Sequence, residues 1–227
     1  MRQLLITIFI LHSMQYFAFG QELKAKKEKS LVYLEEYTIL AKNKKVKHGD
    51  YKKYRSDGSQ VWTGKIDNNN RVGEWTFYES GEKVQTYNYD DKKMTFQKKP
   101  VSPYFVRIDN QIQILPVDTP PSYLGSKIGL TDELNKVLAY PMQARRMGVE
   151  GAVTVAIWIN ADNTLGKIEL ISGIMKECDQ DLIAALKKIP QDWFAATIGD
   201  KKITSKLIIV VDYKLDNIFE NAAVTVR

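Results

Sequence analysis

The sequence predicts an α+β protein in which a repetitive antiparallel β-sheet precedes a compact domain of helices and strands. Three observations support this prediction. A block that begins at Gly49 recurs at Gly73, 24 residues later. Five of the seven prolines lie between Pro100 and Pro121, which indicates a boundary between two folded parts. Beyond this boundary, helical and strand periodicities alternate as far as Leu215.

Residues 1–20 have the pattern of a secretory signal peptide. Arg2 provides the basic start, Leu4 to Leu11 provide an apolar core, and Ala18-Phe19-Gly20 places small residues at the two positions that determine cleavage. The apolar run is shorter than the roughly 20 residues that span a bilayer. We therefore expect cleavage before Gln21 and a soluble periplasmic protein. The alternative is a retained inner-membrane anchor that leaves the protein facing the periplasm.

Length and composition are those of an ordinary globular protein. The chain has 227 residues, of which 44% are hydrophobic, so it can bury a core. Its formal charge is +6, and residues 128–215 hold equal numbers of basic and acidic residues, so the surplus lies in residues 1–127. Such a basic half either contacts an anionic membrane surface or, more commonly, is a solvated face. We expect no nucleic-acid partner.

Residues with catalytic chemistry are few and scattered. Cys178 is the only cysteine, so no internal disulfide forms, and His48 is the only histidine beyond the predicted signal. The acids Glu150, Asp162 and Glu169 lack the spacing of a paired general acid and base. The sequence therefore predicts no enzyme, with no catalytic residues, no cofactor and no metal site.

Residues 21–99 are predicted to form the repetitive sheet. The lysine-rich residues 21–30 are expected to be frayed, and residues 31–40 suit a strand, although their glutamates also suit a helix. The block Gly49-Asp50-Tyr51-Lys52-Lys53-Tyr54 aligns with Gly73-Glu74-Trp75-Thr76-Phe77-Tyr78, and a glycine turn follows each block. Aromatic and polar residues alternate, so one face of each hairpin must stack on its neighbour in a β-meander.

The aromatic residues of the repeats have two interpretations. Five of them lie among lysines and suit stacking on bases or sugars, namely Trp62, Trp75, Tyr78, Tyr87 and Tyr89. Their spacing follows the repeat, however, and favours packing between hairpins. Residues 67–70 lack the alternating acids and closing glutamate of a calcium loop, so we interpret them as a turn. The glycine, aromatic and tyrosine pattern over residues 47–91 resembles bacterial MORN-type repeats. That resemblance implies an interaction or membrane-proximal element.

Residues 100–129 are predicted to be a proline-rich, partly structured linker. Within them, Tyr104–Ile108 and Gln111–Leu115 flank Asp109-Asn110, a pattern typical of a small hairpin.

Residues 130–215 are predicted to form the second domain, followed by a tail over residues 216–227. Thr131 is expected to cap a first helix, and Pro141 to begin a short helical turn that Gly148 ends. Val153, Val155, Ile157 and Ile159 alternate with smaller or polar neighbours, which indicates a strand with one buried face.

The rest of this domain completes a small sheet. A turn at residues 160–163 leads into a second strand over residues 166–171. Asp179 is expected to cap a second helix that Pro190 ends, and residues 203–214 form a long last strand. The prediction is a two-helix, three-stranded antiparallel domain.

A set of motif residues in this part resembles the TonB C-terminal domain family over about residues 118–215. The set comprises Tyr140, Pro141, Ala144, Gly148, Gly151, Pro190 and Trp193. The family has Trp-x-Pro where this chain has Trp193-Phe194-Ala195, a departure that alters the loop before the last strand.

The resemblance implies that a partner segment is added as a strand to the exposed edge of the sheet. The last strand is the candidate edge, with a blocked edge as the alternative. Its candidate partner-binding residues are Ile203, Ser205, Leu207, Ile209, Val211 and Tyr213. The resemblance also implies envelope proteins as partners, including outer-membrane TonB-dependent transporters.

The function expected from these observations is that of a non-enzymatic periplasmic adaptor that binds other proteins. The alternative is a TonB-type energy transducer for outer-membrane transport that keeps its N-terminal anchor. The sequence leaves a homodimer open.

Overall fold

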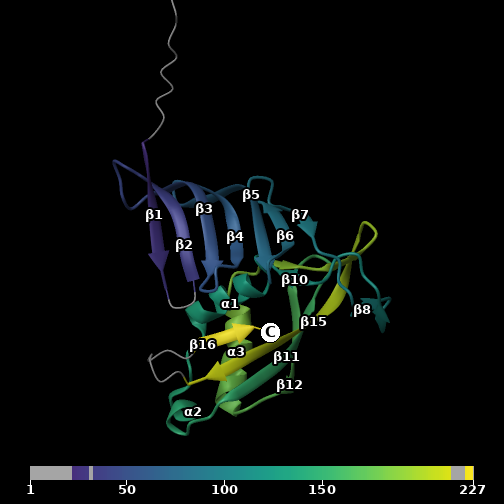
Figure 1. The fold of residues 1–227 in the computed structure, drawn as a ribbon. Helices are drawn as coiled ribbons and strands as arrows, with labels where there is room; N and C mark the ends of the chain where they lie inside the picture. The colour runs from purple at the N-terminus through teal and green to yellow at the C-terminus, as the bar shows by residue number, and fades with distance from the viewer. Residues whose placement is uncertain (1–21, 31–32, 216–222, 227) are drawn as a thin grey trace, which may run out of the picture.

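The computed structural model describes residues 22–30, 33–215 and 223–226, which form two seven-stranded antiparallel sheets and one two-stranded sheet, with the helix α1 (Ser126–Val137) between the two large sheets (Figure 1). The predicted signal peptide lies outside the described residues, as does most of the predicted tail. The first large sheet is the predicted meander, and the second large sheet, called the second sheet below, carries α1 and the helix α3 (Lys176–Lys188) on one face (Figure 1).

The meander has seven strands that pair in sequence order, which confirms an antiparallel repetitive sheet. The strands are β1 (Leu23–Lys29), β2 (Tyr33–Leu40), β3 (Lys47–Arg55), β4 (Gln60–Asp67), β5 (Asn70–Glu79), β6 (Glu82–Asn88) and β7 (Lys93–Gln97). Residues 33–40 are thus a strand rather than a helix.

The expectation that residues 21–30 are frayed is wrong for the described part of this segment. β1 pairs with β2 along its whole length, from Leu23 opposite Leu40 to Lys29 opposite Leu34. The reason is that β2 offers a complete unpaired edge, which satisfies the backbone of β1 despite its lysines. Those lysines stay exposed.

Aromatic side chains fill the core of the meander, as the packing interpretation predicted. Trp75 and Phe77 are fully buried, and the Tyr51 ring lies 5.2 Å from that of Trp75. A Cβ at Gly64 would lie only 2.3 Å from the Trp75 ring. Trp75 therefore requires a glycine on the neighbouring strand, because any side chain there would collide with the indole.

The second sheet has the strand order β12-β11-β15-β8-β9, with β14 and β16 also paired to β15, while β10 pairs with β13. The elements are β8 (Tyr104–Ile108), β9 (Gln111–Leu115), β10 (Ser122–Tyr123), α1 (Ser126–Val137), α2 (Met142–Arg146), β11 (Gly151–Ile159), β12 (Leu165–Ser172), α3 (Lys176–Lys188), β13 (Trp193–Phe194), β14 (Ala196–Ile198), β15 (Lys201–Lys214) and β16 (Ala223–Val226).

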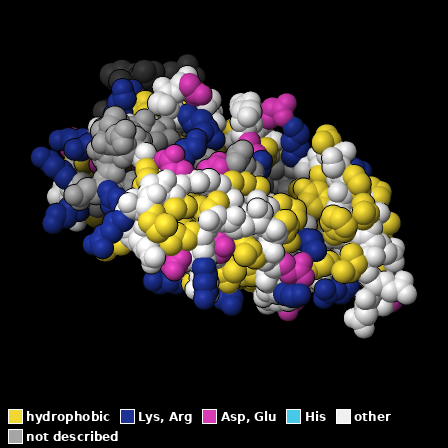
Figure 2. All heavy atoms as spheres, turned by 90° about the horizontal axis from the view of Figure 1, so that it is seen from below, with side chains coloured by type: hydrophobic (Ala, Val, Ile, Leu, Met, Phe, Trp, Pro, Cys, Tyr) yellow, Lys and Arg dark blue, Asp and Glu magenta, His cyan; other side chains and the backbone are white. Residues whose placement is uncertain are grey.

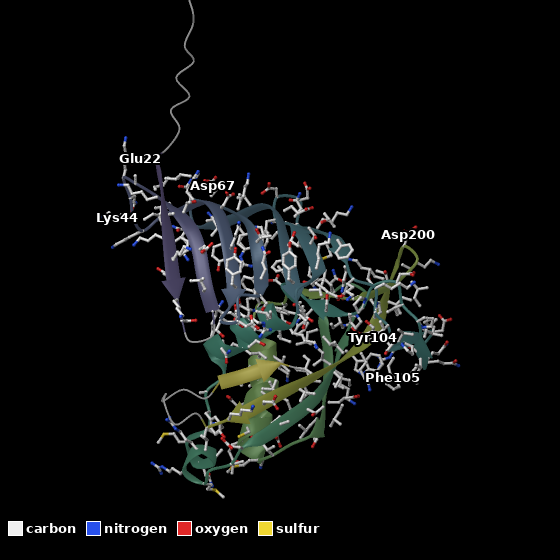
Figure 3. The ribbon with its side chains drawn as sticks, in the orientation of Figure 1. Glu22, Lys44, Asp67, Tyr104, Phe105 and Asp200 are labelled. Atoms are coloured by element: carbon white, nitrogen blue, oxygen red, sulfur yellow. The ribbon has the colours of Figure 1, made fainter. Side chains whose placement is uncertain are left out.

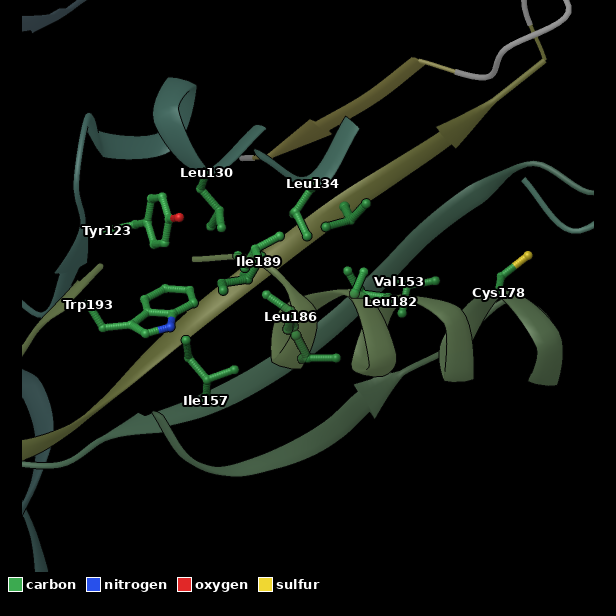
Figure 4. Packing of buried hydrophobic residues seen from close by; sticks show 14 of the residues in the cluster. Tyr123, Leu130, Leu134, Val153, Ile157, Cys178, Leu182, Leu186, Ile189 and Trp193 are labelled. Carbon is green, nitrogen blue, oxygen red and sulfur yellow. The ribbon is translucent and has the colours of Figure 1, made fainter. Parts of the chain in front are cut away.

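The core of this part lies between the sheet and the two longer helices. All four alternating residues of β11, from Val153 to Ile159, are fully buried, as predicted. They meet Leu134 of α1 and Leu182 and Leu186 of α3 (Figure 4). Burial of this apolar stripe is what holds the helices on the sheet.

The predicted count of two helices and three strands is too small. The three predicted strands are present as β11, β12 and β15, but α2 is a third helix and four further strands pair within the same sheet. Both hairpin strands of the predicted linker, β8 and β9, belong to this sheet because β8 pairs with β15. The domain boundaries themselves remain a prediction.

Two predicted helix starts are wrong. Thr131 lies inside α1, which begins at Ser126, and Asp179 lies in the first turn of α3, which begins at Lys176. Both side chains instead form hydrogen bonds with backbone groups four or five residues earlier in the chain. The Thr131 hydroxyl donates to the Lys127 carbonyl, and the Asp179 carboxylate accepts the Ile174 N–H at 3.1 Å.

The short helix α2 was predicted more closely. Pro141 immediately precedes it, one position earlier than predicted. Gly148 follows its end with a φ of +66°, and the next amide, of Val149, donates to the Ala144 carbonyl at 3.0 Å. This is the left-handed stop that the glycine predicted.

The two sheets pack against each other through β10 and the start of α1. Ile128 of α1 is buried in the core of the meander, and the Tyr87 ring lies 5.9 Å from that of Phe194. Lys53 of β3 forms a partly buried ion pair with Asp132 of α1 at 2.5 Å. The meander therefore fixes the position of α1 over the second sheet.

Candidate partner-binding site

The long strand β15 has one edge fully paired and the other only partly paired. Along one edge, β11 pairs with β15 from Ser205 to Tyr213. On the opposite edge, β8 pairs with Thr204 and Ser205, and β16 pairs with residues 211–214. Residues 206–210 lie between them, and within the described part of the chain no strand pairs with this stretch of the edge.

A cavity of about 330 Å³ faces this unpaired stretch. Residues 207–209 form one wall, and the other walls come from the end of the meander, the proline-rich segment and the start of α1. Its apolar lining includes Val84, Pro100, Val101, Tyr104, Pro121 and Leu130. Tyr104 stands at the start of β8, next to Phe105 (Figure 3). We call this cavity the β15 groove.

Lysines outnumber acids among the charged residues of the β15 groove, which also include Glu79. Lys98, Lys99 and Lys127 line it and are exposed to solvent. Lys98 pairs with Glu82, and Lys99 pairs with Asp118 at 3.2 Å. Because these pairs are exposed, they are weak, so an acidic group of a ligand can compete for the lysines.

The side chains predicted to contact a partner lie on the inner face of β15. Ser205, Ile209, Val211 and Tyr213 are buried, while Ile203 and Leu207 are partly buried. The Tyr213 hydroxyl donates to the Cys178 carbonyl at 3.1 Å, and burial raises the pKa of this phenol. These side chains belong to the core. A partner on this edge would meet the backbone of β15.

The opposite face of β15 carries side chains that are not among the predicted partner-binding residues. Ile208 is 43% exposed, and Lys206 forms an ion pair with Glu169 at 3.0 Å. Hydrogen bonds from Lys206 and Lys167 lower the pKa of Glu169. The groove walls upstream of residue 130 are also absent from the predicted site. Their only signal in the sequence is the proline cluster of the predicted linker.

The motif residues support the helices and the loop around β15. Ala144 is fully buried, the Tyr140 hydroxyl donates to the Val149 carbonyl, and a Cβ at Gly151 would lie 2.8 Å from Ile174. The Trp193 ring packs 4.8 Å from that of Tyr123.

The loop after α3 is where the chain departs from the family pattern. The Pro190 carbonyl accepts the Tyr123 hydroxyl at 2.9 Å. Phe194, in the altered motif, contacts Tyr87 of the meander. The altered loop thus belongs to the contact between the two sheets.

Among the described residues, the one cysteine and the one histidine lie apart from each other. Cys178 is buried, and burial raises the pKa of its thiol, while His48 lies in the other sheet. Among the residues that the structure places, no group of three or more histidine, cysteine, aspartate or glutamate side chains is arranged to hold a metal ion.

Comparison with known proteins identifies one region. Residues 136–215 match the family of the Gram-negative bacterial TonB protein C-terminal. The match includes β15 with its unpaired stretch, and it leaves out the meander, the β8–β9 hairpin and β10. No curated protein and no solved structure matches the chain. In the described ranges, no helix is long and apolar enough to cross a membrane.

Proposed function

Starting from the similarity of residues 136–215 to TonB C-terminal domains, we propose that this protein is a non-enzymatic envelope protein that binds an extended segment of a partner. The segment adds as a strand to the outer edge of β15, between β8 and β16. The observation that carries the proposal is the unpaired stretch at residues 206–210, which faces the β15 groove.

The physical basis is the backbone of that stretch. Unpaired N–H and C=O groups on a strand edge gain hydrogen bonds when another strand is added. Five residues of strand span about 16 Å, so a partner segment of four or five residues fills the gap. The fixed neighbours β8 and β16 set its length.

The groove determines which segment fits. Val101, Tyr104 and Leu130 provide apolar contacts, and the exposed Lys99 and Lys127 favour a segment with an acidic group. We assign such segments to envelope proteins, with outer-membrane TonB-dependent transporters as the first candidates. The MORN-like meander serves as the support of the groove, since β6 and β7 adjoin it.

Photo-crosslinking in the native host tests the proposal. A photoreactive phenylalanine analogue replaces Val101, which is fully exposed at the groove, and in a matched strain it replaces Met142, which is exposed on α2. Crosslinks from position 101 to a short extended segment of an envelope protein are expected, with none from position 142. The proposal is wrong if both positions give the same crosslinks, or if neither gives any.

We propose the adaptor role in the periplasm, with energy transduction as the alternative that requires a retained anchor. The two differ at the N-terminus of the native protein. Peptide mass mapping of soluble and membrane fractions should find a start at Gln21 in the soluble periplasmic fraction. A peptide from before Gly20 in the inner-membrane fraction would instead support the energy transducer.

A further inference from the structure

The strand β9 is the outermost strand of the second sheet and carries no charged residue. Its sequence is Gln111-Ile112-Gln113-Ile114-Leu115, and β8 is its neighbour in the sheet order. Ile112 and Ile114 are 56% and 59% exposed. An uncharged, exposed edge strand is a template for pairing with another chain.

The other outermost strands of the two sheets are protected by charge. β1 contains Lys24, Lys26, Lys27 and Lys29, β7 contains Lys93, and β12 contains Lys167 and Glu169. Charged residues, lysine above all, are the usual means by which an edge strand avoids pairing with another chain. β9 is the exception among these four strands, which indicates that its edge is used.

The exposed face beside β9 is apolar. Phe105 of β8 is opposite Ile114, and Arg107 is opposite Ile112, so these four side chains share one face of the sheet. Phe105 is 44% exposed. Hydrophobic side chains gather over the end of the molecule that carries β8, at the right of Figure 2.

We propose that β9 pairs antiparallel with β9 of a second copy of this chain, with Gln113 on the two-fold axis. In this register, Ile112 of each copy lies opposite Ile114 of the other, and Gln111 lies opposite Leu115. The same residue pairs therefore form when the two copies are exchanged, as an isologous contact requires.

The flanking charges are compatible with this pairing. Across the interface, each row on the exposed face runs from Phe105 and Ile114 of one copy to Ile112 and Arg107 of the other. The guanidinium of Arg107 lies 4.4 Å from the Trp158 ring of its own chain. Each Arg107 thus ends an apolar row and faces no like charge directly across the new strand pair.

This second-copy contact is separate from the proposed partner site. β9 lies beyond β8 in the strand order, whereas the partner is proposed to bind β15 itself. A substitution in β9 that prevents dimerisation therefore leaves the partner site on β15 in place, and the two proposals can be tested separately.

Cysteine crosslinking of the protein purified after expression of the full chain tests the register. Residues directly opposite on the axis have Cα atoms about 4.5–5.5 Å apart, which a disulfide can bridge. Gln113→Cys should form at least about tenfold more crosslinked dimer than Gln111→Cys, whose two copies would lie about 14 Å apart. The native Cys178 is buried and takes no part. Equal yields from the two variants would overturn the proposal.

Sedimentation over a concentration series supplies a second measurement. Ile112→Lys should weaken dimerisation at least about tenfold, because it puts a charge into the apolar row. Ile171→Lys is the matched control, since Ile171 is also 56% exposed but lies on β12, and it should dimerise like the natural chain. A natural chain that stays monomeric to about 100 μM would overturn the proposal, as would equal weakening by both substitutions.

Discussion

Gln85 shows how one side chain joins the two sheets. Its amide nitrogen donates to the Ser122 hydroxyl and the Tyr123 carbonyl, both at 3.0 Å. Its amide oxygen accepts the N–H groups of Gly125 at 3.0 Å and Ser126 at 3.1 Å. The first N–H groups of a helix have no partner within the helix, so this residue of β6 acts as the cap of α1.

Replacing Gln85 tests this capping role. Gln85→Met keeps a similar volume but leaves the buried N–H groups of Gly125 and Ser126 without an acceptor, so the free energy of unfolding should fall by about 2–4 kcal/mol. Urea denaturation measures the change. The exposed Gln143→Met is the control and should change the free energy by less than about 0.5 kcal/mol. Equal losses in the two variants would contradict the capping role.

Asp181 makes the folding stability depend on pH. It lies half-buried on α3, its carboxylate accepts the Ala139 N–H at 3.3 Å, and burial raises its pKa above the usual value of 3.8. A carboxyl group with a raised folded-state pKa favours folding in its protonated form. Its contribution is present below the unfolded-state pKa and is lost as the pH rises through the folded-state pKa.

Asp181→Asn should remove this loss, because asparagine keeps an acceptor oxygen but does not ionise. Relative to the natural chain, the variant should gain stability as the pH rises from about 4 to 7 and show no gain near pH 3. Thermal unfolding across that range, with a carboxyl ¹³C NMR titration of Asp181, measures both quantities. A constant difference in stability at all pH values would contradict this account.

At the scale of elements, β15 is the strand on which the sheet depends. It is 14 residues long and pairs with β8, β11, β14 and β16. The sequence predicts this strand over residues 203–214, and the structure begins it two residues earlier, at Lys201. The sequence also predicts the β8–β9 turn, where Asp109 and Asn110 have φ values of 47° and 63°, the left-handed conformation of a two-residue hairpin turn.

The strand β16 limits how much of the β15 edge a partner can use. Deletion of residues 216–227 should extend the unpaired edge from residues 206–210 to residues 206–214, because β16 covers residues 211–214. Hydrogen exchange should then speed up at alternate amides within residues 211–214, while amides of β11 keep their protection. The photo-crosslink yield at position 101 should rise. Unchanged exchange would show that β16 does not protect this edge in solution.

At the scale of the whole molecule, the contact between the sheets makes them one structural unit. Lys53 is 4% exposed, and its ammonium group lies 3.9 Å from the centre of the Tyr33 ring and 4.5 Å from that of Trp62. Its ion pair with Asp132 therefore sits in a largely dry contact. We expect both sheets to unfold in one cooperative transition.

A double-mutant cycle tests this coupling. Lys53→Met should cost about 2–4 kcal/mol, somewhat below the range for a fully buried pair because the Asp132 side chain is 20% exposed. With Asp132→Asn added, the cost should be smaller than the sum of the two single changes. The exposed pair of Lys136 and Glu133 is the control, and Lys136→Met should cost at most about 0.5 kcal/mol. Additive costs, or two separate unfolding transitions, would contradict the coupling.

The sequence by itself determined what depends on local periodicity and turn chemistry. The alternation of apolar residues predicts the buried face of β11, and the repeat predicts the meander. Gly148 predicts the end of α2, and Asp109-Asn110 predicts the β8–β9 turn. These predictions succeed because each signal lies within or beside the element that it specifies. The resemblance to TonB C-terminal domains was likewise carried by residues of one continuous segment, and comparison confirmed it for residues 136–215.

Only the tertiary structure decided how distant segments meet. α1 begins at Ser126 because Gln85, about 40 residues earlier in the sequence, accepts the first N–H groups of this helix. β1 is a strand because it pairs with the free edge of β2. The unpaired stretch of β15 likewise exists because β8 and β16 pair with separate parts of that edge, and the meander and the start of α1 close the groove beside it. Such features depend on contacts between residues far apart in the chain, and neither propensity nor periodicity encodes those contacts.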